Sequence, residues 1–151
     1  MTPEPVLRRA IAADIPAIMR LLADDELGQT RESGDERIYA RAFAEIKHDP
    51  NNIFLVMDIE GAVTGCAQLT IIPGLGRQGV TRGQIESVRV ASGRRGQGLG
   101  RWFMQELIEA ARRRGCGLLQ LTSDRGRPDA HRFYESLGFT TSHLGFKLAL
   151  R

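Results

Sequence analysis

The stretch Arg95-Gly96-Gln97-Gly98-Leu99-Gly100 decides the fold of this chain. It follows a run of alternating residues, 84–90, and opens an amphipathic stretch, 98–114. The glycines at every second position lack Cβ atoms, so a ligand can approach the backbone closely. The first turn of a helix also presents unpaired N–H groups and partial positive charge. The stretch therefore predicts a strand-to-helix turn that binds a diphosphate, with a turn that binds nothing as the alternative.

The segments on either side of this turn carry strand and helix patterns in alternation. Residues 139–150 are expected to return as one or two strands, and 27–34 and 73–79 are expected to be loops. The order predicts an α/β (α+β) fold in one domain, 1–151, with a mixed sheet of roughly six or seven strands and about four helices. The other expected strands are 6–10, 53–59, 63–72, 84–90 and 118–122, and the expected helices are 14–22, 37–47, 98–114 and 128–137.

Composition indicates a globular protein rather than a membrane or secreted one. The 151 residues are 42% hydrophobic and 26% charged, which is ordinary for a soluble domain. No apolar run approaches the roughly 20 residues of a membrane helix, and residues 1–5 lack the order of a signal peptide. We therefore expect a cytoplasmic protein. The cysteines Cys66 and Cys116 form no CxxC pair, and the three histidines show no ligand spacing, so no metal site is predicted.

Charge is unevenly distributed along the chain. Residues 24–37 contain six acids against two arginines, whereas residues 87–105 contain four arginines within 89–101. The basic stretch suits an anion, and the acidic stretch could favour a cation. A solvated surface is the alternative for both. Nucleic acid is a weaker partner for the basic stretch, because no aromatic residue is interleaved with it before Trp102. We read Trp102 as helix packing, with adenine stacking as the alternative.

Residues 84–139 resemble the GNAT superfamily of acetyl-CoA-dependent N-acetyltransferases. The family's Arg/Gln-x-x-Gly-x-Gly/Ala loop corresponds to 95–100, and its Ala-x-x-Phe-Tyr-Glu-x-x-Gly-Phe segment corresponds to 130–139. The two motifs flank an apolar strand in the family's order. One position departs from the pattern: many members have Asn where this chain has Arg127. That arginine, or Arg125, could reach a phosphate or an acidic substrate instead, with a solvent-facing loop as the alternative.

The resemblance implies a binding mode for the coenzyme. The backbone amides from Arg95 to Arg101 would hold the pyrophosphate, and the strand edge at Val88 and Val90 would pair with the pantetheine amides. The Val90 amide would also stabilise the oxyanion of the tetrahedral intermediate. The full set of residues implied to bind acetyl-CoA is Val88, Arg89, Val90, Arg95, Gly96, Gln97, Gly98, Leu99, Gly100, Arg101, Arg127, Ala130 and Phe133.

Two residues are candidates for proton transfer. The resemblance assigns Tyr134 as the acid that protonates the leaving thiolate; a tyrosine packed beside Phe133 and Leu137 is the alternative. Glu86 is the candidate base that accepts the amine's proton. Strand alternation predicts Glu86 on the same side as Val88 and Val90, and Arg89 on the other. A carboxylate in that strand is costly unless it is used or paired, so an ion pair with an arginine is the alternative.

These observations predict an acyltransferase that moves acetyl from acetyl-CoA to a primary amine by direct attack in a ternary complex. The acceptor would be a small molecule or a peptide, set by residues 22–40, 73–82 and 140–147; the acidic stretch suggests a cationic one. A homodimer is possible. The main rival is a non-catalytic acyl-CoA-binding sensor. A dinucleotide-binding protein fails at Arg101, where its motif needs glycine, and a nucleic-acid-binding protein is favoured only by arginine content.

Overall fold

The computed structural model describes residues 3–151, apart from the side chain of Glu26. The chain forms two compact units, Met1–Gln120 and Leu121–Arg151. The first contains most of the sheet and the Gly-rich turn, and the second contains the Phe-Tyr-Glu segment.

The first unit is built on an antiparallel sheet to which one parallel strand is added. Its described strands lie in the order β1-β2-β3-β4-β5. At the β5 end, the Gly117 amide donates to the Thr81 carbonyl at 2.9 Å, and Gln120 bonds to Gln84. From the first of these bonds to the second, the residue numbers rise in both segments, so β5 runs parallel to β4. The strands are β1 (Val6–Arg9), β2 (Asn52–Ile59), β3 (Ala62–Ile72), β4 (Arg82–Val90) and β5 (Leu118–Leu121).

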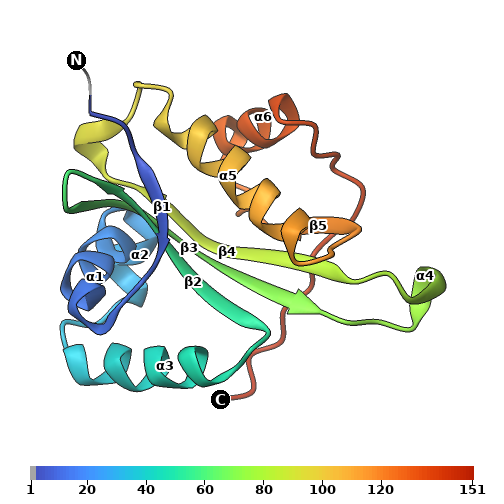
Figure 1. The fold of residues 1–151 in the computed structure, drawn as a ribbon, viewed down its shortest axis with the longest axis horizontal. Helices are drawn as coiled ribbons and strands as arrows, with labels where there is room; N and C mark the ends of the chain where they lie inside the picture. Colours follow the sequence, from blue (N-terminus) through green and yellow to red (C-terminus); the bar gives the residue numbers. More distant parts are fainter. Residues whose placement is uncertain (1–2) are drawn as a thin grey trace. The chain divides into compact units, whose positions relative to one another are not determined.

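Helices cover both faces of this sheet (Figure 1). On one face lie α1 (Ile15–Ala23), α2 (Glu26–Arg31) and α3 (Glu36–His48), and the side chains of Ile18 and Leu21 pack against Val56 and Cys66. On the other face lies α5 (Leu99–Arg113), which contacts β3 and β4. Its apolar stripe is fully buried at Phe103, Met104 and Leu107. This core fixes the start of α5 at the end of β4.

The expectation of a loop over 27–34 was wrong, because α2 occupies most of it. The Asp25 side chain caps this helix by accepting a hydrogen bond from the Gly28 amide. Gly28 also permits a close approach: a Cβ there would lie 2.0 Å from the Leu22 carbonyl oxygen. The glycine that suggested a loop therefore allows α2 to pack directly against the end of α1.

The expected strand count was also wrong, because the described residues contain five strands rather than six or seven. Residues 139–150 form no strand, although their apolar residues alternate. The expected loop at 73–79 contains a single turn, α4 (Gly76–Gly79), in which Arg77 and Gln78 are left-handed. With six helices in the described residues, the expectation of about four missed α2 and this turn.

A β-bulge in β4 reverses the expected alternation of its side chains. Glu86 pairs with Gln68 and Arg89 pairs with Cys66, so β4 has one more residue than β3 between these pairs. Ser87 takes a positive φ of 58° at this point. Glu86 and Arg89 consequently share the face that carries α1, and Val90 lies on the face that carries α5. The prediction that Glu86 and Val90 share one side was wrong for this reason.

The second unit begins at the end of β5 and contains α6 (Pro128–Ser136). Pro128 at the first turn and Gly138 after the last one delimit the helix. The Tyr134 ring packs edge-on between Phe133 and Phe139, with ring centroids 5.3 and 5.9 Å away. Among the described helices of both units, none is long and apolar enough to cross a membrane.

Candidate active site

The Gly-rich turn joins the end of β4 to α5 through two left-handed glycines. Gly96 has φ 80° and Gly98, the N-cap of α5, has φ 75°. Glycine reaches this region without the steric penalty of a Cβ. A Cβ at either position would meet nothing within 4 Å, so the space above the turn is open. The glycines are thus required by the backbone conformation and leave room for a ligand.

The backbone donors of this turn find no acceptor in the part of the chain that the structure describes. Between residues 3 and 151, the amides of Gly96, Gln97, Gly98, Leu99 and Gly100 donate to no described acceptor. The first bond of α5 is that of the Trp102 amide to the Gly98 carbonyl, at 3.1 Å. Unpaired N–H groups at a helix N-terminus attract an anion. This turn can therefore accept a phosphate group through the main chain.

Positive charge surrounds the same turn. Arg94 and Arg95 make no ion pair with any carboxylate among residues 3–151. Arg95 is exposed and Arg94 half-buried. The helix dipole of α5 adds to this potential at its N-terminus. Net positive charge beside free amides favours a multiply charged anion such as a pyrophosphate.

The bulge of β4 is held in place from the α1 face of the sheet. The Cys66 thiol donates to the Ser87 carbonyl at 3.5 Å, and Arg89 Nη1 donates to the Val88 carbonyl at 3.0 Å. Arg89 Nε also lies 3.2 Å from a carboxylate oxygen of Asp25. Both partners of this ion pair are largely buried, and it links the start of α2 to the bulged strand; Arg89 Nε itself donates no hydrogen bond to a described residue. The bulge interrupts the ladder with β3 at Val88, one of the two residues expected to pair with pantetheine, whereas the other, Val90, is in register with Gly65.

Glu86 is exposed and forms no ion pair with any residue that the structure describes. The expectation of a costly carboxylate within an apolar strand does not hold, because water solvates this side chain. Of the two interpretations considered, the ion pair with an arginine is therefore absent from the described residues. Glu86 is left as an accessible carboxylate beside the bulge.

A row of polar side chains surrounds Glu86 on its face of the sheet. Asn52 Oδ1 accepts hydrogen bonds from Gln68 and Thr70, at 3.0 and 2.6 Å, and Gln120 donates to Gln84 at 2.7 Å. Arg82 shares this face by alternation and pairs with no described carboxylate. We call this surface the polar face; it consists of Asn52, Gln68, Thr70, Arg82, Gln84, Glu86 and Gln120.

The second unit holds the remaining predicted residues. Tyr134, Phe133 and Ala130 lie on α6 and are half-buried, and Arg127 is the exposed N-cap residue of that helix. The Asp124 carboxylate accepts a hydrogen bond from the Gly126 amide at 2.9 Å, so it caps the turn that follows β5. The aromatic packing of Tyr134 is likewise present, and it leaves the proposed chemical role untested.

Ser123, directly after β5, adds a further polar group to the second unit. Its hydroxyl oxygen is buried and bonds to no residue in the described chain. Buried polar atoms normally have a partner. An unpaired hydroxyl directly after β5 is therefore a further candidate contact for a ligand.

The acidic stretch is largely engaged within the protein. Asp25 faces Arg89, the Glu32 carboxylate accepts a bond from the Tyr39 hydroxyl at 2.7 Å, and Asp35 pairs with Arg37. The Arg37 guanidinium lowers the pKa of Asp35. These carboxylates stabilise α2 and α3, so the stretch gives less support to a cationic acceptor than its composition suggested.

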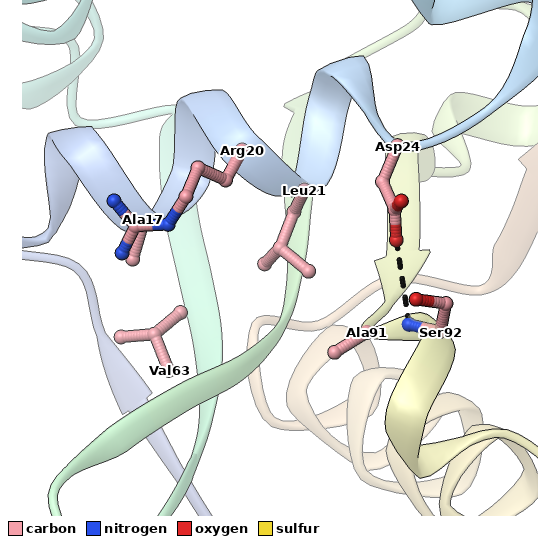
Figure 2. Close-up of a pocket in the computed structure, with 7 residues that line it drawn as sticks. All are labelled: Ala17, Arg20, Leu21, Asp24, Val63, Ala91 and Ser92. Atoms are coloured by element: carbon pink, nitrogen blue, oxygen red, sulfur yellow. Dashed lines mark hydrogen bonds between the residues drawn. The ribbon is translucent and has the colours of Figure 1, made fainter.

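Two open clefts lie in the first unit. One, of about 280 Å³, lies between α1 and the end of β4, over a floor that includes Leu21, Val63 and Ala91 (Figure 2). At its rim the Asp24 carboxylate accepts a hydrogen bond from the Ser92 amide at 3.4 Å. The other, of about 350 Å³, lies beside the β3–β4 connection and is lined by Gly74, Leu75, Gly76, Arg77, Val80 and Arg82.

The cysteines are not placed for covalent catalysis. Cys66 is fully buried, and burial raises its pKa to about 12, which keeps the thiol protonated and unreactive at neutral pH. Burial also raises the pKa of Cys116. Within residues 3–151, no three His, Cys, Asp or Glu side chains gather where a metal could bind.

Comparison with known proteins agrees with this architecture. The chain matches the model of the acetyltransferase (GNAT) family over residues 15–139, and it belongs to that family. It is 29% identical to aminoalkylphosphonate N-acetyltransferase of Salmonella typhimurium over 95% of this chain and 90% of that protein. It is 37% identical to glucosamine 6-phosphate N-acetyltransferase of Trypanosoma brucei brucei, over 60% of this chain and 59% of that relative.

A solved structure is similar over nearly the whole length. The crystal structure of a transcriptional regulator from Bacillus halodurans C-125 superposes with a TM-score of 0.93 at 44% identity, over 97% of this chain and 100% of that chain. The family and these relatives support acyl transfer as the class of reaction and acetyl-CoA as the donor. They confirm the resemblance on which the sequence interpretation depended.

The sequence interpretation did not include two features of the candidate site. Arg82 alternates with Gln84 and Glu86, and this spacing would have placed it on their face of the sheet. The ion pair of Asp25 with Arg89 had no such signal, because the two residues are 64 positions apart and meet only in the folded chain.

Proposed function

We propose that this protein transfers an acetyl group from acetyl-CoA to a primary amine of a small molecule, by direct attack in a ternary complex. The observation that carries the proposal is the turn of free amides at Gly96–Gly100 beside the bulged strand β4. The family model runs from residue 15 to residue 139, through both compact units. We therefore also propose that the two units form one acetyltransferase domain.

In this proposal the main chain binds the donor. The amides of the turn hold the coenzyme's pyrophosphate, which anchors its long pantetheine arm along β4. The interrupted ladder leaves backbone groups near Val88 for the pantetheine amides, and the Val90 amide stabilises the oxyanion that forms on the thioester carbonyl. Arg127, Ala130 and Phe133 of the second unit are proposed as further contacts to the coenzyme.

Two side chains are proposed to move protons. An alkyl ammonium has a pKa of roughly 10, and only its neutral form attacks a thioester. Glu86, exposed and unpaired among the described residues, accepts that proton directly or through water. Tyr134 donates a proton to the departing thiolate. The thioester is already activated, so no covalent acyl-enzyme is needed.

We further propose an acceptor that carries an anionic group besides its amine. Arg82 extends the row of Gln84 and Glu86 on the polar face and pairs with no described carboxylate. Its backbone lies about 13 Å from that of Glu86, four residues along the strand, and its long side chain narrows this gap. The substrates named for two relatives, glucosamine 6-phosphate and an aminoalkylphosphonate, combine an amine with such a group.

A thiol-release assay tests this function. Acetyl-CoA is incubated with a panel of amines that pairs each phosphorylated amine with its unphosphorylated analogue, and free coenzyme A is measured. We expect turnover with a phosphorylated amine. Glu86→Gln should lower kcat at least tenfold. Arg82→Gln should raise the KM for the phosphorylated amine and leave the KM for its unphosphorylated analogue unchanged. The controls are Glu45→Gln and Arg41→Gln, on exposed positions of α3. If none of the amines in the panel causes release of coenzyme A, the enzymatic proposal is contradicted.

A second candidate is an acyl-CoA-binding module without catalysis. The transcriptional regulator that is 44% identical to this chain favours it. Such a module would bind acetyl-CoA tightly and release no coenzyme A with any amine of the panel. The same assay, combined with a binding measurement, separates the two functions.

A further inference from the structure

The cleft between α1 and the end of β4 carries opposite charges at its two ends. Arg20 and Asp24 both line it (Figure 2). Opposite charges four residues apart on a helix are close enough to pair with each other. Here they diverge: the Arg20 side chain extends back towards Ala17, and the Asp24 carboxylate is directed to Ser92. The cation and the anion of this cleft therefore stand apart, with the Leu21 side chain between them.

Both charged groups are available to a ligand. Arg20 is exposed and forms no ion pair with a carboxylate between residues 3 and 151. Asp24 is exposed as well, and the Ser92 amide that donates to it lies 3.4 Å away, which is long for such a bond. A guanidinium and a carboxylate bind each other through two parallel hydrogen bonds. The cleft can therefore hold an anionic group at Arg20 and a cationic group at Asp24.

The floor between the two charges is apolar and preformed. Leu21 belongs to the buried core of the first unit, and Val63 and Ala91 pack against that core. An aliphatic chain that covers these side chains removes apolar surface from water, which adds binding free energy to that of the two charged groups. The floor therefore suits a ligand with an aliphatic middle.

The length of the cleft limits the ligand further. At a rise of 1.5 Å per residue, the helix from Ala17 to Asp24 spans about 10 Å. With a hydrogen bond at each end, the charged groups of the ligand are roughly 5–7 Å apart. The ammonium and carboxylate on the α-carbon of an amino acid are too close together for this. A molecule with several methylene groups between its two charges fits.

The same cleft borders the Gly-rich turn. Ala91 and Ser92 line it, and the short helix η2 (Ser92–Arg94) leads from there directly to Arg95. The Asp24 carboxylate thus places negative charge beside the residues proposed to hold the coenzyme's pyrophosphate. A cation bound to Asp24 would neutralise that charge and reduce its repulsion of the pyrophosphate. Binding in the cleft and binding at the turn would then strengthen each other.

We propose that this cleft is a second small-molecule site, which binds an aliphatic carboxylate with a guanidinium or ammonium group at its other end. The carboxylate bonds to Arg20, the cationic group bonds to Asp24, and the chain between them covers Leu21, Val63 and Ala91. Bound there, the molecule strengthens the binding of acetyl-CoA. None of these residues belongs to the polar face. The effect on acetyl-CoA rests on the proposed role of the Gly-rich turn, whereas the site itself does not.

An NMR titration of the full chain with 4-guanidinobutanoate tests the site without any turnover. A guanidinium stays protonated at neutral pH, so this probe is not an acetyl acceptor. We expect saturable shifts of the amide signals at residues 17–24, 63 and 91–92. Butanoate and butylguanidinium each lack one charged end, and their dissociation constants are expected to be at least tenfold higher.

Variants at the two charged positions test the mode of binding. Arg20→Gln and Asp24→Asn are each expected to weaken binding of the probe at least fivefold. The matched controls, Arg41→Gln and Glu45→Gln on exposed positions of α3, are expected to bind it as the wild type does. Their amide spectra also show whether each variant is folded.

Calorimetric titration with acetyl-CoA measures the effect on the coenzyme. At saturating 4-guanidinobutanoate, we expect acetyl-CoA to bind at least threefold more tightly to the wild type. Asp24→Asn removes the negative charge, so it is expected to bind acetyl-CoA more tightly without the probe and to gain nothing when the probe is added. Equal affinity of the wild type with and without the probe would overturn the link between the cleft and the coenzyme.

Three results of the NMR titration would overturn the site itself. The first is the absence of saturable shifts. The second is a set of shifts at Gln84 and Glu86 in place of the cleft, which would mean that the probe occupies the polar face. The third is unchanged binding of the probe in both Arg20→Gln and Asp24→Asn. If the wild type binds no acetyl-CoA, the proposed function fails, and the shifts caused by the probe still decide whether the site exists.

Discussion

Individual side chains decide whether this site catalyses or only binds. Tyr134 has a structural task, since its ring packs between Phe133 and Phe139. The hydroxyl is not needed for that packing, so a phenylalanine retains it. Replacing Tyr134 with phenylalanine therefore removes the proposed acid and keeps the aromatic cluster that holds the ring.

We predict that Tyr134→Phe lowers kcat by about a hundredfold, the usual effect of losing a general acid. The KM for acetyl-CoA is expected to change little, because the ring remains. Steady-state thiol release measures both constants. The other tyrosine, Tyr39→Phe, serves as the control and should keep kcat. An unchanged kcat in the Tyr134 variant would exclude it as the acid.

A second residue-scale prediction concerns stability rather than activity. Asp14 is buried, and the Arg8 guanidinium donates to its two carboxylate oxygens at 2.7 and 3.0 Å. These hydrogen bonds lower the pKa of Asp14 below its ordinary value. The pair therefore stabilises the folded state fully above the unfolded pKa of roughly 4, and the contribution is lost as the pH falls through the folded pKa.

Asp14→Asn is consequently expected to lower the free energy of unfolding by about 2 kcal/mol at pH 7, since it removes one of the two carboxylates that Arg8 bonds and leaves Arg8 with Asp58, 2.9 Å from its Nε. The difference in free energy of unfolding between this variant and the wild type should become smaller below about pH 4. Urea unfolding at a series of pH values measures this, with the exposed Glu45→Gln as the control. If this difference in free energy is the same at pH 3 and pH 7, the charged pair is not its origin.

At the scale of elements, the bulge in β4 is the feature that the site depends on. It requires Ser87 at a φ of 58°, a region that most side chains adopt only at a cost. The thiol of Cys66 and the Arg89–Asp25 ion pair hold this conformation against that cost. The strand is therefore bent by its tertiary contacts and not by a local glycine.

The bulge gives a paired prediction. Ser87→Gly should preserve acetyl-CoA affinity and change stability by less than about 1 kcal/mol, because glycine accepts the positive φ. Ser87→Val should destabilise by about 1–2 kcal/mol and weaken acetyl-CoA binding, because a β-branched residue resists that conformation. Thermal melts and calorimetry on both variants test this. Equal affinity in the two would show that binding does not need the bulge.

The sequence predicted the strands and helices that carry local signals. The strand over 84–90, the apolar stripe of α5 and the strand-to-helix turn between them lie where the sequence predicted them, although the bulge reverses the side-chain alternation after Glu86. Three features failed for non-local reasons. The helix α2 forms because Gly28 permits contact with α1, the face of Arg89 follows from the bulge, and 139–150 lacks a strand because its backbone finds no partner within the described chain.

The candidate site divides in the same way. Motifs sufficed to find the Gly-rich turn and the segment around Tyr134, since residues close in sequence form each of them. The sequence did not predict the polar face, because only the register of three strands brings Asn52, Thr70 and Gln84 into one row. The partners of the acidic stretch escaped as well, because Arg89 reaches Asp25 only in the folded chain.

For the whole molecule, the account depends on the unpaired amides of one turn binding the pyrophosphate of acetyl-CoA. Calorimetric titration with acetyl-CoA tests this most directly, on the wild type, on Gly98→Val and on the control Gly93→Val. Gly98 needs a positive φ at the N-cap of α5, whereas a Cβ at Gly93 meets nothing within 4 Å and no positive φ is present there.

We predict one acetyl-CoA bound per chain in the wild type and in Gly93→Val, and at least tenfold weaker binding in a folded Gly98→Val. A wild-type protein that binds no acetyl-CoA, or a Gly98→Val variant that binds it as tightly as the control does, would contradict the account.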